Sequence, residues 1–186
     1  MKNNEYLNKL YKKNEQGEFI IEVYIDKLLN AFNEWDSSYL EIRELNSSLI
    51  YYIERCSNDI PISQSVELRF IVSQENKEQE EVLKEALKTN FNYQLHLVKQ
   101  KLQFLYKKSA KYFAISILFL MMAFTMKPLF QLNLAGDLVV EGLFIGGWVF
   151  LWQSISLFSF ESLEVVHKKK IFERLLNSGI IVEYRP

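Results

Sequence analysis

The sequence contains few residues of the kinds that build redox and metal sites. Among its 186 residues there are one cysteine, Cys56, and two histidines, His96 and His167. A single thiol excludes an intramolecular disulfide and any metal site that needs two cysteines. The two histidines lie far apart in the chain and do not have the spacing of metal ligands. We therefore expect no metal ion and no cofactor.

Excess charge of one sign is also missing. The 22 lysines and arginines nearly balance the 23 aspartates and glutamates, which leaves a formal net charge of -1. A nucleic-acid-binding domain would need a strongly basic face, so no nucleic-acid partner is expected. The chain also lacks the motifs GxGxxG, GxxxxGK[ST], HExxH and GxSxG. Asp36, Arg43, Glu44 and Asp59 show no site-like spacing, so no catalytic residue is predicted and enzymatic activity is disfavoured without being excluded.

Long apolar runs, in contrast, are present. Residues 142–160 form 19 consecutive positions without a formal charge, and residues 112–126 form 15. About 20 apolar residues span a bilayer, and Lys111 and Lys127 can lengthen the shorter run by snorkelling. A buried hairpin in a soluble protein is the alternative, but two such runs are too apolar for a domain of this size. We predict transmembrane helices at 107–127 and 138–160.

Positive residues flank this pair of helices on the side of both chain ends. Lys107, Lys108 and Lys111 precede the first helix, and Lys168, Lys169, Lys170 and Arg174 follow the second. The connection at 128–137 lacks such an excess, because Asp137 lies within it and Glu141 shortly beyond it. Lysine and arginine mark the cytoplasmic side of a membrane protein. We expect a plasma (inner) membrane protein with cytoplasmic termini and an external loop at 128–137.

The remaining sequence predicts a small α/β module. Residues 19–25 are rich in β-branched and aromatic types, and residues 65–73 alternate between apolar and polar positions, so both are predicted as strands. A helix at 47–57 lies between them, with Asn46 or Ser47 as its cap. A strand-like end at 180–184 can join the same sheet. The predicted fold class is an α+β membrane protein whose cytoplasmic module comprises residues 1–106 and 161–186.

One long helix is expected to connect this module to the first transmembrane segment. Asn76 and Gln79 have capping-box spacing, and neither glycine nor proline interrupts residues 76–127. Along it, ten residues recur at alternating spacings of three and four: Leu95, Val98, Leu102, Leu105, Ser109, Tyr112, Ser116, Phe119, Ala123 and Met126. Such a seam packs against another helix. The partner is either the second transmembrane helix of the same chain or another copy of the protein.

The second transmembrane segment contains the other candidate site residues. Gly142 and Gly146 form a GxxxG pattern, which brings helices into close contact. Trp148, Trp152, Gln153 and Ser156 add polar groups to the same segment. They either form hydrogen bonds inside one hairpin or line the pore of an oligomer. Lys168, Lys169 and Lys170 are candidates for binding lipid headgroups.

The stretch Gly146-Gly-Trp-Val-Phe-Leu-Trp152, preceded by Glu141-Gly142, resembles a family of small uncharacterised bacterial two-span membrane proteins. Members have a cytoplasmic α/β segment before the hairpin and a short basic tail after it. The resemblance covers most of the chain loosely and this stretch best. It implies the same architecture, but it brings no known activity and no functional residues.

The sequence as a whole favours a non-enzymatic two-pass membrane protein. Its cytoplasmic module would bind a cytoplasmic protein or sense a small-molecule signal. Self-association would use the 95–126 seam and Gly142 with Gly146. One alternative is an oligomeric pore-forming or membrane-disrupting effector, and a second is an enzyme that acts close to the membrane.

Overall fold

The structure, a computed structural model, describes residues 7–40, 42–130 and 134–185. The chain divides into two compact units. Residues 1–96 and 169–186 form an α/β module, and residues 97–168 form a helical hairpin. Helix α3 (Lys77–Phe130) belongs to both units, because it begins in the module and ends in the hairpin.

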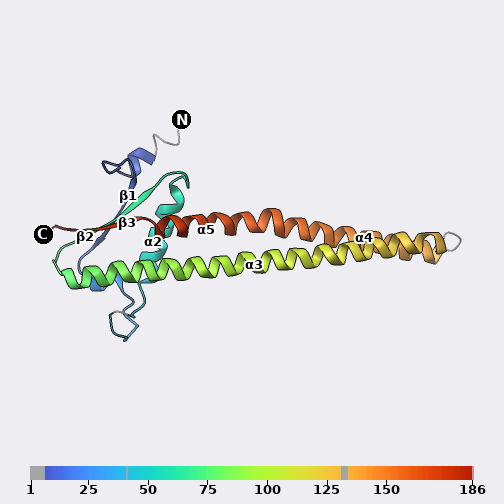
Figure 1. The fold of residues 1–186 in the computed structure, drawn as a ribbon, viewed down its shortest axis with the longest axis horizontal. Helices are drawn as coiled ribbons and strands as arrows, with labels where there is room; N and C mark the ends of the chain where they lie inside the picture. The colour runs from blue at the N-terminus through green and yellow to red at the C-terminus, as the bar shows by residue number, and fades with distance from the viewer. Residues whose placement is uncertain (1–6, 41, 131–133, 186) are drawn as a thin grey trace. The chain divides into compact units, whose positions relative to one another are not determined.

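The module is built on a three-stranded parallel sheet (Figure 1). Its strands are β1 (Phe19–Ile25), β2 (Val66–Val72) and β3 (Gly179–Tyr184), in the order β1-β2-β3. All three strands predicted from the sequence are therefore present, and the C-terminal strand joins the edge of β2. Because parallel neighbours need long crossover connections, helix α2 (Ser47–Asp59) links β1 to β2.

Alternation within β2 determines which face of the sheet is buried. The residues that the sequence assigns to one face are at most 2% exposed: Val66, Leu68, Phe70 and Val72. They share the module core with residues of α2 and α3, including Ile53, Leu83 and Phe91, each fully buried. The predicted alternation of β2 is confirmed, and the opposite face of the sheet carries Glu67 and Arg69 beside the apolar Ile20 and Ile71.

Side-chain caps fix where the two long segments of the module become helical. The Asn46 side chain accepts a hydrogen bond of 2.9 Å from the backbone N–H of Ser48 and starts α2. The Asn76 side chain accepts one of 3.2 Å from the N–H of Gln79 and starts α3. Both caps agree with the sequence, because an asparagine at this position satisfies an otherwise unpaired N–H. Helix α3 is continuous to Phe130, as expected up to residue 127.

The second arm of the hairpin is helical over a longer range than the apolar run alone. Helix α4 (Leu134–Ser156) continues through a π-helical turn (Leu157–Glu161) into helix α5 (Ser162–Leu176). Helices α3 and α4 also extend into the expected external loop 128–137, of which residues 131–133 lie outside the described residues. Both helical rods are long and apolar enough to cross a membrane.

The described residues of the stretch 26–45 form mostly a loop, with a short 3-10 helix at Leu28–Ala31. Phe32 is 1% exposed and anchors the stretch to the core, whereas Trp35 is 94% exposed and lies on the loop directed into solvent.

Arg174 of α5 holds the C-terminal end of α2. Its guanidinium donates to the carbonyl oxygens of Ile60 at 3.1 Å and Pro61 at 2.8 Å, to the carbonyl oxygen of Ser57, and to Ser57 Oγ at 2.7 Å. The last carbonyls of a helix lack intrahelical partners, and a cation there also interacts favourably with the helix dipole. The sequence counted Arg174 among the basic residues that flank the membrane; the structure gives it a structural role in the module.

Replacing Arg174 with methionine should destabilise the module by about 2–4 kcal/mol, because several buried carbonyls would lose their donor. Thermal or denaturant unfolding of the full chain, followed by circular dichroism, measures the loss. Arg185→Met is the matched control, since the Arg185 side chain is 57% exposed and, among the described residues, pairs with Glu183. Its effect should stay within about 0.5 kcal/mol. Equal destabilisation by the two variants would contradict the capping role.

Candidate functional site

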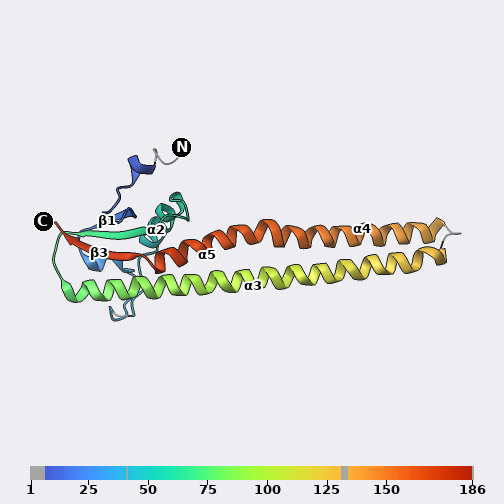
Figure 2. The same cartoon turned by 45° about the horizontal axis from the view of Figure 1, so that its top comes forward.

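The interior of the hairpin is formed by small residues. On α3, Ser109 is 6% exposed, and Ser116 and Ala123 are fully buried. On α4, Gly147 is buried and Ser154 is 5% exposed. The two arms lie side by side in both views (Figures 1 and 2). Small side chains let helix backbones approach closely, so these positions bring the two arms into close contact.

Hydroxyl groups form the polar contacts of this interface. Ser109 Oγ donates to the Ser154 carbonyl oxygen at 2.9 Å, and Ser154 Oγ donates to the Ser109 carbonyl oxygen at 3.0 Å. Seven residues further along α3, Ser116 Oγ donates to the carbonyl oxygen of Gly147 at 2.8 Å. Each of these hydroxyls therefore has a partner on the opposite arm. They link the arms, and none of these three serines presents its hydroxyl on the outside of the hairpin.

The two arms share one repeat. Ser109 lies opposite Ser154 and Ser116 lies opposite Gly147, a step of seven residues on each arm in opposite directions. The next step pairs Ala123 with Val140, which are 0% and 5% exposed. A seven-residue repeat is the period of left-handed helix supercoiling. The seam predicted on α3 thus faces the second arm of the same chain.

The two glycines of the GxxxG pattern have different surroundings within the hairpin. A Cβ atom on Gly142 would have no neighbour within 4 Å, whereas one on Gly146 would lie 3.0 Å from Phe119. Gly147, which the sequence analysis did not select, is the most restricted, because its Cβ would lie 2.8 Å from the Leu120 side chain. Gly142 therefore faces away from α3. Gly147 lies seven residues before Ser154, just as Ser109 lies seven residues before Ser116. This shared spacing is the sequence signal that would have identified Gly147.

The tryptophans and Gln153 point away from the first arm. Trp148 and Trp152 are each 64% exposed, and Gln153 is exposed, whereas Ser156 is half-buried. The sequence placed both tryptophans near the middle of the apolar run. In the register of the two arms, however, Trp152 lies level with Lys111. Trp148 lies one helical turn further toward the middle of the apolar section. Trp152 is therefore at the charged end of the apolar section of α3.

Large apolar side chains cover the outside of the hairpin. Phe124, Leu138, Ile145 and Val149 are each at least 60% exposed. In each arm, only 17% of the most apolar 18-residue window is buried. Small and hydroxylated residues thus recur inside, together with Leu105, Val140 and ring contacts between the arms such as that of Phe119 with Phe150, and many large apolar side chains are exposed on the outside. This distribution is the reverse of that in a water-soluble helical hairpin.

The π-helical turn keeps a charge out of the helix interface. The buried positions of α4 recur every seven residues at Val140, Gly147 and Ser154, and the next position in a regular helix would be Glu161. The turn adds one residue, so that Ser162, at 4% exposure, is buried and Glu161 is exposed. Ser162 Oγ donates to the Phe158 carbonyl oxygen within the turn. A one-residue insertion of this kind is the usual form of a π-bulge.

Lys168, Lys169 and Lys170 lie on α5. Lys168 and Lys170 are exposed, and Lys169 is half-buried and pairs with Glu173 at 3.4 Å, one helical turn further on. The three ammonium groups therefore do not form a single converging site. Lys168 and Lys170 remain accessible candidates for an anionic surface.

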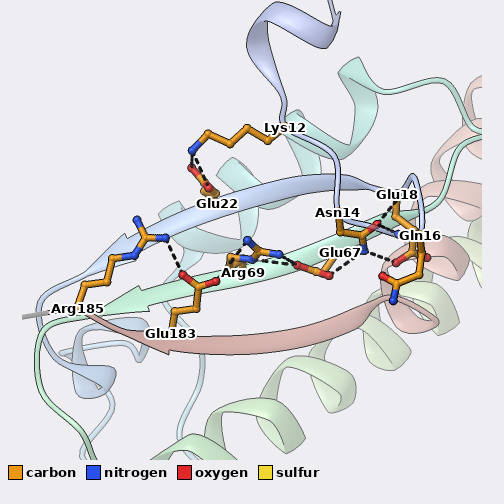
Figure 3. Close-up of polar contacts among 9 residues, drawn as sticks. All are labelled: Lys12, Asn14, Gln16, Glu18, Glu22, Glu67, Arg69, Glu183 and Arg185. Carbon is orange, nitrogen blue, oxygen red and sulfur yellow. Dashed lines mark hydrogen bonds and ion pairs between the residues drawn. The ribbon is translucent and has the colours of Figure 1, made fainter.

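The polar face of the sheet contains a connected charge network (Figure 3). Glu67 of β2 is 5% exposed and accepts from Arg69 at 2.5 Å and from Asn14 Nδ2 at 2.9 Å. Arg69 also pairs with Glu183 of β3 at 3.3 Å. The bond to Glu67 raises the pKa of Arg69 above its ordinary value. The network connects the segment before β1 to β2 and β3. Because each of these charged groups is already paired, we assign it a structural role.

The loop between β1 and α2 is held by Asp36. Its carboxylate accepts from the N–H of Ser38 at 3.0 Å and from the N–H of Glu44 at 2.8 Å. Arg43 donates to the Ser38 carbonyl oxygen at 2.9 and 3.1 Å and closes the same loop. The hydrogen bonds from the Ser38 side chain and from the Glu44 and Ser38 backbones lower the pKa of Asp36 to about 2. These contacts join Asp36 and Ser38 to Arg43 and Glu44 within the described part of the loop.

Among the described residues, no group of three or more histidine, cysteine, aspartate or glutamate side chains is arranged to hold a metal ion. Comparison of the chain with protein-family models, curated proteins and solved structures finds no match. The resemblance to two-span bacterial membrane proteins therefore stays a prediction.

Substituting isoleucine for Gly147 should separate the arms, because the added side chain would overlap Leu120. We expect a loss of about 1–3 kcal/mol, typical of overpacking. The measurement is thermal unfolding of the purified chain in detergent. Gly142→Ile adds the same atoms to the same helix where space is open, and it should leave stability nearly unchanged. An equal loss in both variants would argue against the observed packing.

The Asp36 loop should lose its order only at strongly acidic pH. A lowered pKa means that the ionised carboxylate stabilises the loop above the ordinary value of 3.8 and that this contribution disappears as the pH falls through about 2. The backbone amide resonances of Ser38 and Glu44 report the transition by nuclear magnetic resonance. Their midpoint should lie near 2. A midpoint near the ordinary aspartate value would mean that the two hydrogen bonds do not persist in solution.

Proposed function

We propose that this chain is a two-pass integral membrane protein that presents a small α/β module at the cytoplasmic face. The observation that carries the proposal is the reversed distribution of side chains in the hairpin. Ser116 and Ala123 are fully buried, whereas Ile145 and Phe124 are 65% and 69% exposed. In water, exposure of this much apolar surface would be strongly unfavourable. In a bilayer the same surface contacts lipid. Because lipid offers no hydrogen bonds, the serine hydroxyls need partners on the opposite arm, and they have them.

The positions of charged and aromatic residues support this placement. Lys111 and Lys127 lie 16 residues apart on α3, which corresponds to about 24 Å of helix. Snorkelling of both lysines extends this distance toward the roughly 30 Å of a hydrocarbon core. Trp152, level with Lys111, then lies in the interfacial region that tryptophan prefers. The basic residues on the side of the module favour a cytoplasmic location for both termini.

The module is the part that would meet other molecules. It has its own hydrophobic core, and the hairpin interior is already filled, so binding of a cytoplasmic protein or a small-molecule signal falls to the module. Self-association would have to use the outer surface of the hairpin, because the 95–126 seam faces inward. Gly142, with open space around it, is the position on that surface where a second copy could approach most closely.

The pore-forming alternative has less support. Its channel needs polar groups on the outer surface of the hairpin, and the hydroxyls of Ser109, Ser116 and Ser154 are paired inside. Of the candidate pore-lining residues, Gln153, Trp148 and Trp152 do face outward. Membrane depolarisation on expression would favour the pore over the anchored module.

A lysine in place of Ile145 tests the membrane location. If Ile145 faces lipid near the middle of the bilayer, the substitution should cost about 2.5–3.5 kcal/mol of insertion free energy. The variant should then be depleted from the fraction that resists alkaline extraction of membranes. If the hairpin were in water, the same substitution at a 65% exposed site would be tolerated.

Ile181→Lys is the matched control, because Ile181 is 42% exposed but lies on β3 of the module. Its membrane fraction should equal that of the unmodified chain. Recovery of the unmodified chain among soluble proteins after alkaline extraction would refute the membrane location itself. Full insertion of Ile145→Lys would refute the assignment of the outward face to lipid.

A further inference from the structure

Three lysines gather on one side of α3, directly before its apolar section. Lys107 and Lys111 are exposed and lie one helical turn apart, and the half-buried Lys108 adjoins them. The Nζ atom of Lys108 lies 5.9 Å from the centre of the Tyr112 ring, so this ammonium group is directed along the helix toward the apolar section. All of these residues belong to the hairpin unit, residues 97–168.

The three lysines have no carboxylate to neutralise them. Residues 86–130 contain neither aspartate nor glutamate, and the second arm has no formal charge from 142 to 160. Within the described part of the chain, no ion pair involves any of the three, whereas Lys84 pairs with Glu80 at 2.7 Å on the same helix. Like charges three and four residues apart on a helix repel each other. An anion bound at this patch would relieve that repulsion.

Aromatic side chains surround the hairpin at the level of these lysines. Trp152, which lies level with Lys111, is 64% exposed. Tyr106 of α3 and Phe158 of the second arm have ring centres 5.7 Å apart and are 40% and 62% exposed. Tryptophan and tyrosine concentrate where a bilayer meets water. In a membrane, the ammonium groups would therefore lie at the depth of the lipid headgroups.

We propose that Lys107, Lys108 and Lys111 form a binding surface for the negatively charged headgroups of anionic phospholipids. Charge complementarity selects this partner, because ammonium groups without internal counter-ions lie at the depth of an anionic headgroup layer. The same side of α3 also offers apolar surface for the acyl chains. Leu118, seven residues after Lys111, returns to that side and is 56% exposed, and Met122 follows one turn later at 43% exposure.

The lysines after the second arm are not placed for this role. Lys168 lies 16 residues beyond Trp152, which corresponds to about 24 Å of helix. The headgroup region of a bilayer is only about 5–8 Å deep on each side. Headgroup binding, which the sequence assigns to Lys168 and the two lysines after it, therefore moves to the first arm.

This inference rests on the proposed membrane location, and the two can fail separately. The purified full-length chain is reconstituted into phosphatidylcholine vesicles that contain a trace of spin-labelled phosphatidylglycerol or of spin-labelled phosphatidylcholine. Electron paramagnetic resonance measures the fraction of each labelled lipid that the protein immobilises. A chain that stays outside the vesicles would refute the membrane location. An inserted chain that immobilises both lipids equally would refute only the inference.

We expect the inserted chain to prefer phosphatidylglycerol by about fivefold, which is roughly the effect of one lysine close to an anionic surface. High salt should weaken the preference. Lys107→Gln with Lys108→Gln and Lys111→Gln should bring the ratio close to one. Replacing Lys168, Lys169 and Lys170 with glutamine removes the same charge, and this matched variant should keep the full preference. An equal loss in the two triple variants would overturn the proposal, because the number of lysines and not their position would then decide.

Inorganic phosphate separates a lipid headgroup from a free anion as the bound group. Sodium phosphate and sodium chloride are added to the vesicles at equal ionic strength. The preference for phosphatidylglycerol should fall equally with both salts, because the lipid is held by its headgroup charge at the bilayer surface. A clearly larger fall with phosphate would show a site for the free anion and would overturn the assignment to lipid.

Discussion

The close approach of α3 and α4 through small residues is the constraint on which the hairpin depends. Reciprocal bonds between Ser109 and Ser154, and the bond from Ser116 to Gly147, require backbones near enough for a hydroxyl to reach a carbonyl oxygen on the other arm. Larger side chains at these positions would separate the arms. With these residues at the interface, many of the large apolar side chains of both helices lie outside, among them Ile145 and Val149. This exposed apolar surface is the basis of the proposed membrane location.

The same repeat accounts for the π-helical turn. Val140, Gly147 and Ser154 follow a seven-residue period, and this period would place Glu161 against α3. One inserted residue places Ser162, instead of Glu161, at the buried position, and the chain continues as helix α5. The second arm can then continue to Arg174, which caps α2, and to β3, which completes the sheet. Helix α3 and the α4–α5 segment thus each belong to the hairpin at one end and to the module at the other.

Much of the fold follows from the sequence, because its signals are local. Alternation in β2, the caps at Asn46 and Asn76, and the unbroken apolar runs each depend on a few neighbouring residues. The candidate site was harder to predict, since it depends on register between distant segments. Gly142 and Gly146 share a motif, yet only the alignment of the two arms shows that Gly147 is the tighter contact.

The most direct test of the account is the surroundings of the outward face of α4. Cys56 is the only cysteine, so a Cys56→Ser background allows a single spin label at position 145 in the full chain reconstituted into lipid vesicles. Electron paramagnetic resonance then compares collisions of the label with oxygen, which concentrates in the hydrocarbon core, and with a water-soluble nickel complex. The account predicts high oxygen accessibility and low nickel accessibility. The reverse result, with nickel dominant, would contradict a hairpin whose apolar exterior faces lipid.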